Sequence, residues 1–171
     1  WMLRSKLAPG TRCALEHGGV APVIVDASAD LNKAIPAILK GGFYHAGQVC
    51  VSVQRVFVHQ DLSQNFANQL TAQAQRLSVG DPLSATTEVG PLIRPAEAQR
   101  IDDWVQAAVA DGAQLLCGGE ILPNNCYAPT VLLNPPRDAK VSREEIFGPV
   151  VCIYEYSDLK DAIQQANELD V

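Results

Sequence analysis

Short apolar runs alternate with longer segments of helical periodicity along most of the chain, and this alternation limits the possible folds more than any other feature. The strand-like runs lie at 22–25, 55–58, 114–117, 130–133 and 150–154, and all but 114–117 contain β-branched residues. Between most of them, apolar residues recur at the i, i+3, i+4 spacing of one helix face. Strands that alternate with helices in this way form a parallel sheet. The sequence therefore predicts an α/β fold with a mainly parallel sheet and helices on both of its faces.

The ends of the predicted helices carry local signals. Asp30 is of the residue type that caps a helix, and the apolar positions of that helix begin at Leu31. Pro36 lies inside the same helix and predicts a kink. The other predicted helices are 61–77, 95–112 and the segment that begins at Asp158.

Length and charge narrow the possible functions. The 171 residues suffice for one domain. The net charge of −6 argues against nucleic acid as a partner, because binding to phosphates needs a basic face. No apolar run approaches the roughly 20 residues of a membrane span. We expect a soluble cytoplasmic domain that covers residues 1–171. Both ends are predicted to be cut, because the chain opens at Trp1 and stops at Val171 just past a helix.

The five cysteines form neither a metal-binding nor a disulfide pattern. No two of them make a Cys-x-x-Cys pair, and none lies at ligand spacing from one of the three histidines. We therefore expect reduced thiols and no metal site. Cys117 and Cys152 lie in strand runs and are expected in the core. Cys50 follows Gly47 and is expected near a helix start, where a thiolate is favoured; the alternative is a buried, small apolar side chain.

Two acidic segments are further candidates for chemistry. Glu16 is followed after one residue by two glycines, so it could face a pocket as a general base or be a solvated loop carboxylate. Glu145 and Phe147 lie in a Glu-Glu-Ile-Phe-Gly-Pro segment directly before a buried strand, where loops often hold ligands. The alternative for this segment is a charged loop between two elements, with the Phe147 ring buried in the core as a plug. A Gly-x-Gly-x-x-Gly phosphate loop does not occur in the sequence.

The order of these motifs is more specific than any one of them. Glu-x-Gly-Gly, then Gly-Gln-x-Cys, then Glu-Glu-Ile-Phe-Gly-Pro resembles the aldehyde dehydrogenase superfamily, and the likeness extends over essentially the whole chain. Cys50 follows Glu16 by 34 residues, which matches the family. One departure is His17, where the family usually has Leu.

The resemblance implies roles for four residues. Cys50 would be the nucleophile that attacks the aldehyde, with its backbone N–H as half of an oxyanion hole. After hydride transfer to NAD or NADP, Glu16 would activate the water that hydrolyses the thioester on Cys50. Glu145 would hydrogen-bond to the nicotinamide ribose, and Phe147 would pack near the nicotinamide ring. The expected substrate is an aldehyde and the expected product is a free carboxylic acid.

The resemblance also implies what lies outside this chain. In relatives, a dinucleotide-binding domain precedes the position of Trp1, and a segment that helps to assemble homo-oligomers follows the position of Val171. The 171 residues are therefore expected to be a single, truncated catalytic domain that is inactive and binds no cofactor by itself. Two alternatives remain at this point. One is a non-catalytic relic that acts as an interaction module, and the other is a relative that passes the acyl group to coenzyme A, against which Glu16 argues.

Overall fold

Five strands form one mixed sheet in the computed structural model, which describes residues 5–169. The strands are β1 (Ala21–Val25), β2 (Val53–His59), β3 (Gln114–Cys117), β4 (Thr130–Leu133) and β5 (Val150–Tyr156). Their order across the sheet is β1-β2-β5-β4-β3. The pairs β1–β2, β2–β5 and β5–β4 are parallel, and β3 joins the edge antiparallel to β4. The predicted α/β fold with a mainly parallel sheet is confirmed.

The helices are α2 (Leu31–Phe43), α3 (Gln60–Ala74), α4 (Pro95–Ala110), α5 (Lys140–Arg143) and α6 (Leu159–Ala166), with a 3₁₀ turn η1 (Tyr44–Gly47) after α2. Two helices, α2 and α6, begin directly after the predicted starts at Asp30 and Asp158, and α4 begins at Pro95 as predicted. The Asp30 carboxylate accepts a hydrogen bond of 3.0 Å from the Asn32 N–H, as a capping residue does. Pro36 does not end α2, which continues to Phe43.

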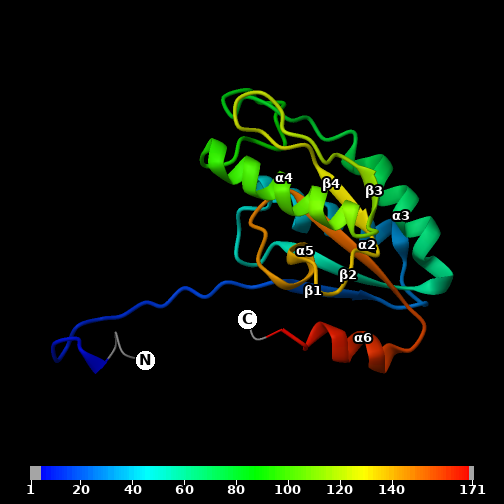
Figure 1. The fold of residues 1–171 in the computed structure, drawn as a ribbon, viewed down its shortest axis with the longest axis horizontal. Helices are drawn as coiled ribbons and strands as arrows, with labels where there is room; N and C mark the ends of the chain where they lie inside the picture. The colour runs from blue at the N-terminus through cyan, green and yellow to red at the C-terminus, as the bar shows by residue number, and fades with distance from the viewer. Residues whose placement is uncertain (1–4, 170–171) are drawn as a thin grey trace.

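Helices cover both faces of the sheet (Figure 1). On one face, Gly42 of α2 lies so close to the Val151 side chain that no Cβ would fit between them. On the other face, the Tyr154 hydroxyl lies 2.7 Å from the hydroxyl of Ser142 in α5. Val151 and Tyr154 point to opposite faces because side chains alternate along a strand. The helix α6 lies on the Tyr154 face, where it contacts β1 and β5.

A buried arginine joins the last helix to the first strand. The Arg55 guanidinium donates to the Val20 carbonyl from Nε and Nη2, at 3.2 and 3.1 Å. It also donates to the carbonyls of Gln165 and Ala166, each at 3.1 Å. These carbonyls lie in the last turn of α6, where a cation and a donor are both favourable. Arg55 therefore fixes the end of α6 against the residue that precedes β1.

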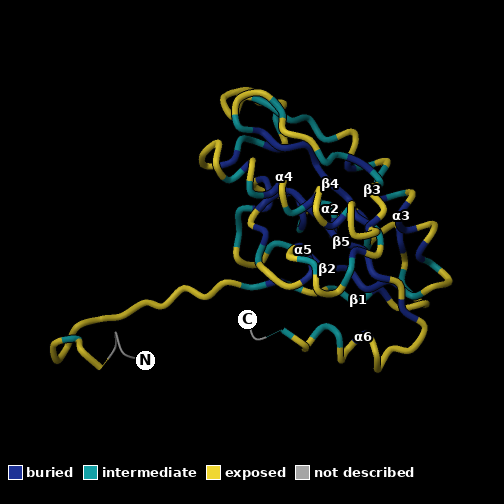
Figure 2. The backbone as a smooth tube through the Cα atoms, viewed as in Figure 1, coloured by how far each residue is buried: buried dark blue, intermediate teal, exposed yellow. Residues whose placement is uncertain are grey.

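Residues 5–17 run away from the body of the fold as an extended arm (Figure 1). Nearly all of them are exposed (Figure 2). None of the helices within residues 5–169 is long and apolar enough to cross a bilayer.

Candidate active site

Cys50 lies in a tight turn between η1 and β2 and is exposed to solvent. The turn is closed by the Ser52 N–H, which donates to the Val49 carbonyl at 2.9 Å. The expectation of a helix start at Cys50 is wrong, because a helix precedes the turn and a strand follows it. The alternative of a buried apolar thiol is wrong as well. The Cys50 N–H has no acceptor among the residues that the structure describes.

The backbone before this turn adopts a conformation that side chains disfavour. His45, Ala46 and Gly47 have φ values of 49°, 55° and 70°. A left-handed run that includes two non-glycine residues costs free energy and persists only where the surroundings enforce it. Gln48 provides that enforcement, because its amide donates to the Pro91 carbonyl at 3.2 Å and accepts from the Ile93 N–H at 2.9 Å. The turn is thus anchored to a loop more than forty residues away in sequence.

Gly47 also sets the distance between the Cys50 turn and the segment that contains Phe147. A methyl group at Gly47 would overlap the backbone of Gly148. We expect Gly47→Ala to lower the free energy of unfolding by about 3 kcal/mol or more, since backbone strain and overlap with an immobile carbonyl add together. Gly112→Ala is the matched control, because Gly112 also has positive φ but has no neighbouring atom within 4 Å of an added methyl group. Urea denaturation of both variants measures the difference, and equal losses would contradict the close approach.

Glu145 lies directly beside Gly18, the first of the two glycines that follow Glu16. A methyl group added at Gly18 would lie 2.7 Å from Glu145 Oε2. The other carboxylate oxygen, Oε1, is buried and has no hydrogen-bond partner among the described residues. A buried acceptor without a donor is costly, so such atoms mark places where a ligand or water completes the site. Within the described residues, the hydrogen-bonding capacity of Oε1 is therefore unused.

Phe147 has a φ of 49° and is 41% exposed. The alternative that Phe147 is a core plug is therefore wrong. The preceding residue, Ile146, is buried, and its carbonyl accepts from Arg100 Nη2 at 2.7 Å. The strained conformation turns the phenyl ring out of the core while the residue before it stays anchored. An exposed aromatic ring held in this way offers a flat apolar surface to a ligand.

Gln54 holds the Glu145 segment in place, and the sequence reasoning missed it. Its buried amide donates to the carbonyls of Val141 and Glu144, at 2.8 and 2.9 Å. Its oxygen accepts from the Ile146 N–H at 2.9 Å. The available signal was a polar residue next to a strand run four residues after Cys50, but such residues are usually exposed.

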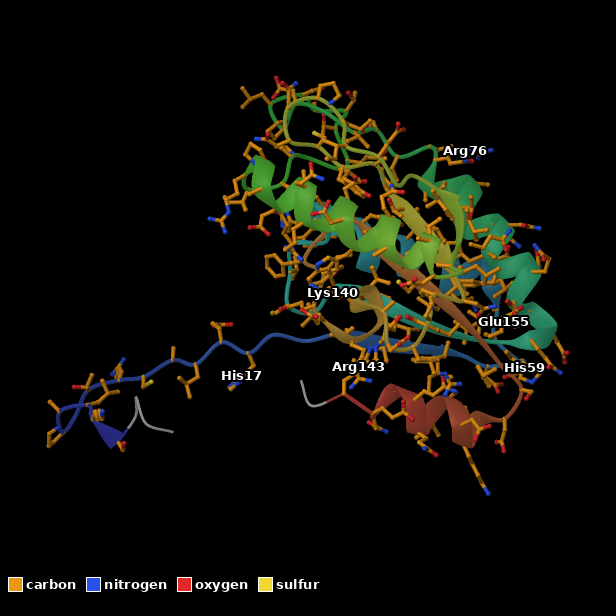
Figure 3. All side chains as sticks on the ribbon, viewed as in Figure 1. His17, His59, Arg76, Lys140, Arg143 and Glu155 are labelled. Atoms are coloured by element: carbon orange, nitrogen blue, oxygen red, sulfur yellow. The ribbon has the colours of Figure 1, made fainter. Side chains whose placement is uncertain are left out.

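Glu16 lies on the exposed arm, and within residues 5–169 its carboxylate forms no hydrogen bond or ion pair. The chain that follows the arm meets the Cys50 turn at Gly19, where an added methyl group would lie 3.2 Å from the Cys50 carbonyl oxygen. The structure thus brings together Gly18, Gly19, Glu145 and Cys50, and leaves Glu16 two residues farther along the arm. His17 is likewise exposed on the arm (Figure 3).

The cysteines differ in the state of their thiols. Burial raises the pKa of Cys117 to about 11 and that of Cys152 to about 12, and it also raises the pKa of Cys126. A raised pKa removes the thiolate at neutral and mildly basic pH, and burial limits access as well. Cys13 and Cys50 are exposed.

Iodoacetamide is therefore expected to label Cys50 and Cys13 of the folded chain and to leave the three buried thiols unlabelled at pH 8. We expect Cys50 to react fastest, because its turn is anchored through Gln48 to the Pro91 segment, whereas Cys13 lies on the exposed arm. Peptide mapping over time measures each rate, and unfolding in urea should make the five rates similar. Faster labelling of Cys13 than of Cys50 would remove the basis for treating Cys50 as the nucleophile.

The described side chains show no grouping that could hold a metal ion. Across residues 5–169, no group of three or more His, Cys, Asp or Glu side chains comes together as possible metal ligands. The segments that do approach one another are the Cys50 turn, the glycines at 18 and 19, and the segment that contains Glu145 and Phe147.

Comparisons with known proteins agree over nearly the whole chain. The model of the Aldehyde dehydrogenase family matches residues 3–171. A 3-sulfolactaldehyde dehydrogenase of Priestia megaterium is 41% identical over 169 residues, which are 99% of this chain and 35% of that protein. A betaine aldehyde dehydrogenase of Brucella anthropi is 36% identical over 162 residues, which are 91% of this chain and 33% of that protein. The chain thus spans about a third of the length of these curated relatives.

Solved structures show the same likeness. Aldehyde dehydrogenase 21 from Physcomitrella patens, in complex with the reaction product succinate, has a TM-score of 0.84 and 41% identity. The likeness covers 89% of this chain and 32% of that one. Betaine aldehyde dehydrogenase from Staphylococcus aureus, in complex with NAD⁺, has a TM-score of 0.84 and 32% identity, with 89% of this chain and 32% of that one covered.

Proposed function

The chain belongs to the aldehyde dehydrogenase family, and on that premise we propose that it is the nucleophile-bearing catalytic domain of an NAD(P)-dependent enzyme that oxidises an aldehyde to a carboxylic acid. The observation that carries the proposal is the convergence of the exposed Cys50 turn with Gly19 and of Glu145 with Gly18. This domain would act together with a dinucleotide-binding domain. The full enzyme would be a cytoplasmic homo-oligomer.

In the first half of the proposed reaction, the Cys50 thiolate adds to the aldehyde carbon and gives a thiohemiacetal whose oxygen carries the negative charge. The free backbone N–H of Cys50 supports a role as donor to this oxygen, because it has no acceptor in the described part of the chain. The bound nicotinamide nucleotide supplies the hydride acceptor. Loss of hydride from the thiohemiacetal carbon leaves an acyl thioester on Cys50.

In the second half, Glu16 takes a proton from water, and the resulting hydroxide attacks the thioester carbonyl. The carbon–sulfur bond breaks, the acid leaves, and the Cys50 thiolate is restored. The two glycines after Glu16 support this role, because they leave little bulk between the arm and the Cys50 turn. A hydrolytic base at position 16 favours free acid over acyl-coenzyme A as the product.

The residues on the Glu145 side fit a nicotinamide nucleoside. A rotation of the Glu145 carboxylate that brings the buried, unpartnered Oε1 to a ribose hydroxyl would remove the cost of leaving this oxygen unsatisfied. The outward ring of Phe147 can pack against the flat nicotinamide. Gln54 and Arg100 would keep both residues in place through their bonds to the intervening backbone.

Trapping the covalent intermediate tests the proposal. A protein that joins this chain to a dinucleotide-binding domain is mixed with aldehyde and NAD⁺, quenched in acid within milliseconds, and digested for mass spectrometry. We expect the peptide with Cys50 to gain the mass of the acyl group, and the same peptide of a Cys13→Ser control to gain it equally. An acyl group on another residue, or acyl-coenzyme A as the released product, would contradict the proposal.

A further inference from the structure

A pocket opens beside Cys50, apart from the residues proposed to hold the cofactor. Both sequence neighbours of Cys50, Val49 and Val51, line it together with Ser52. Its volume is about 420 Å³. Gly18, Glu145 and Phe147 are not among its lining residues. Cys50 itself is not a lining residue either, so a molecule in this pocket would contact the residues on both sides of Cys50 and leave Gly18, Glu145 and Phe147 free.

One face of α2 and η1 forms the remaining wall. The lining residues Ala37, Lys40, Gly41 and Tyr44 follow the i, i+3, i+4, i+7 spacing of a single helix face. Ala37 and Gly41 are small, so they form a shallow base between two long side chains. Tyr44 is 51% exposed, and its ring packs on His45 with centroids 3.8 Å apart.

Lys40 is the one charged residue in this lining. It is exposed, and its ammonium group forms no ion pair or hydrogen bond within the part of the chain that the structure describes. Glu88 lines the neighbouring pocket on the other side of Lys40. The Glu88 carboxylate, however, accepts hydrogen bonds from the Ser78 N–H and hydroxyl at 2.9 and 3.2 Å. In a chain with a net charge of −6, the pocket beside the nucleophile thus presents a free cation.

The neutral part of the pocket defines the rest of the ligand. Val49, Val51 and the Tyr44 ring offer apolar surface next to Cys50, which suits a short run of methylene groups. A lysine ammonium is a compact point charge with three donors, and it pairs with a carboxylate or a sulfonate alike. A quaternary ammonium group needs aromatic rings around it and is repelled by a lysine, so this pocket is unsuited to it.

We propose that Lys40 binds the anionic end of the substrate, so that the aldehyde oxidised at Cys50 is an acidic one with a carboxylate or sulfonate at its far end. This inference rests on the proposed function. It identifies the substrate class, which the names of the relatives leave open: 3-sulfolactaldehyde carries an anionic group, and betaine aldehyde carries a cationic one.

Steady-state kinetics of the full enzyme tests the proposal with four aldehydes: 4-oxobutanoate, 3-oxopropane-1-sulfonate, butanal and betaine aldehyde. We expect kcat/KM for at least one of the two anions to exceed that for butanal about tenfold or more, a difference of about 1.4 kcal/mol. Lys40→Met should remove most of this preference through a higher KM, because the contact is the same in the ground and transition states. Which anion is preferred tells whether the terminal group is a carboxylate or a sulfonate.

Lys33→Met is the matched control. Lys33 lies on the same helix and is exposed, but it pairs with Asp30 at 3.6 Å and does not line the pocket. Its replacement should leave the ratio between anionic and neutral aldehydes unchanged. The same ratio in wild type and Lys40→Met would overturn the proposal, and so would a preference of the wild type for betaine aldehyde.

A binding experiment on the chain itself separates this inference from the proposed reaction. Succinate should slow the labelling of Cys50 by iodoacetamide, whereas the neutral isostere succinamide at equal concentration should have little effect. Lys40→Met should raise the succinate concentration needed for half-protection at least about fivefold, and Lys33→Met should leave it unchanged. If succinate protects Cys50 in a way that depends on Lys40, but the full enzyme oxidises no aldehyde, the proposed function is refuted and the inference about Lys40 stands. Equal protection by succinate in wild type and Lys40→Met would refute the inference.

Discussion

The 171-residue chain alone is expected to show no NAD⁺- or NADP⁺-dependent oxidation of any aldehyde and no calorimetric signal when NAD⁺ is added. Glu145 and Phe147 supply one edge of the proposed nicotinamide site, and the sequence contains no Gly-x-Gly-x-x-Gly loop for the pyrophosphate. Two contacts cannot offset the entropy of fixing a free dinucleotide, which costs at least several kcal/mol. Holding the hydride acceptor against the reacting carbon is worth about 7–11 kcal/mol of the barrier, so a rate loss on the order of 10⁵-fold or more is expected.

The control for this prediction is a protein that joins the same chain to a dinucleotide-binding domain, tested under the same conditions. Circular dichroism of the isolated chain shows whether it keeps the α/β fold, so that loss of the reaction can be separated from loss of structure. Measured NAD-dependent turnover by the purified, folded chain would contradict the prediction and the view that this domain needs a second one.

Glu16→Gln in the two-domain enzyme should slow steady-state turnover by about 10²–10⁴-fold and leave formation of the acyl-enzyme intact. The glutamine keeps the size of the side chain but cannot take a proton from water. Because hydride transfer precedes hydrolysis in the proposed reaction, we expect a rapid burst of NADH equal to the number of active sites, followed by slow release of acid. Stopped-flow absorbance at the wavelength of NADH measures both phases.

Glu120→Gln is a suitable control for the loss of one negative charge, because Glu120 is an exposed loop residue that follows β3. It should leave both phases unchanged. A Glu16→Gln enzyme with an unaltered steady-state rate would show that another group activates the water. Loss of the burst as well would show that position 16 acts before hydrolysis.

Much of the fold could be predicted from the sequence because most of its strands are short apolar runs separated by clear helical periodicity. The runs at 130–133 and 114–117 match β4 and β3, and the caps Asp30 and Asp158 precede α2 and α6. The direction of β3 could not be predicted, because pairing direction depends on where the intervening loop returns the chain. The helix α5 was missed because four residues are too few to show a helical period.

The sequence predicts which residue types make up the candidate site, but it could not predict how they are arranged in space. The motifs identified Cys50 and Glu145 as candidates, but the left-handed run at His45–Gly47 follows from anchors supplied by distant segments. Only one of those three residues is glycine, so local sequence gives little sign of positive φ. Gln54 and Lys40 escaped notice for a related reason. The role of Gln54 and the proposed role of Lys40 depend on which residues lie next to them in space, and the periodicity of a strand or helix does not reveal these neighbours.

The order of strands across the sheet has a consequence for how the protein is made. The central strand β5 lies between β2 and β4, yet it follows both of them in the chain. During synthesis, β2 and β4 therefore emerge with unpaired edges, and their partner arrives only after residue 150. Such distant parallel pairing is slow, and open strand edges invite aggregation. Gly47 and Gly148 meet only at that stage, so the Cys50 turn should be among the last parts to form. Pulsed thiol labelling during refolding would show this as late protection of Cys152, and early protection would place β5 in the folding nucleus instead.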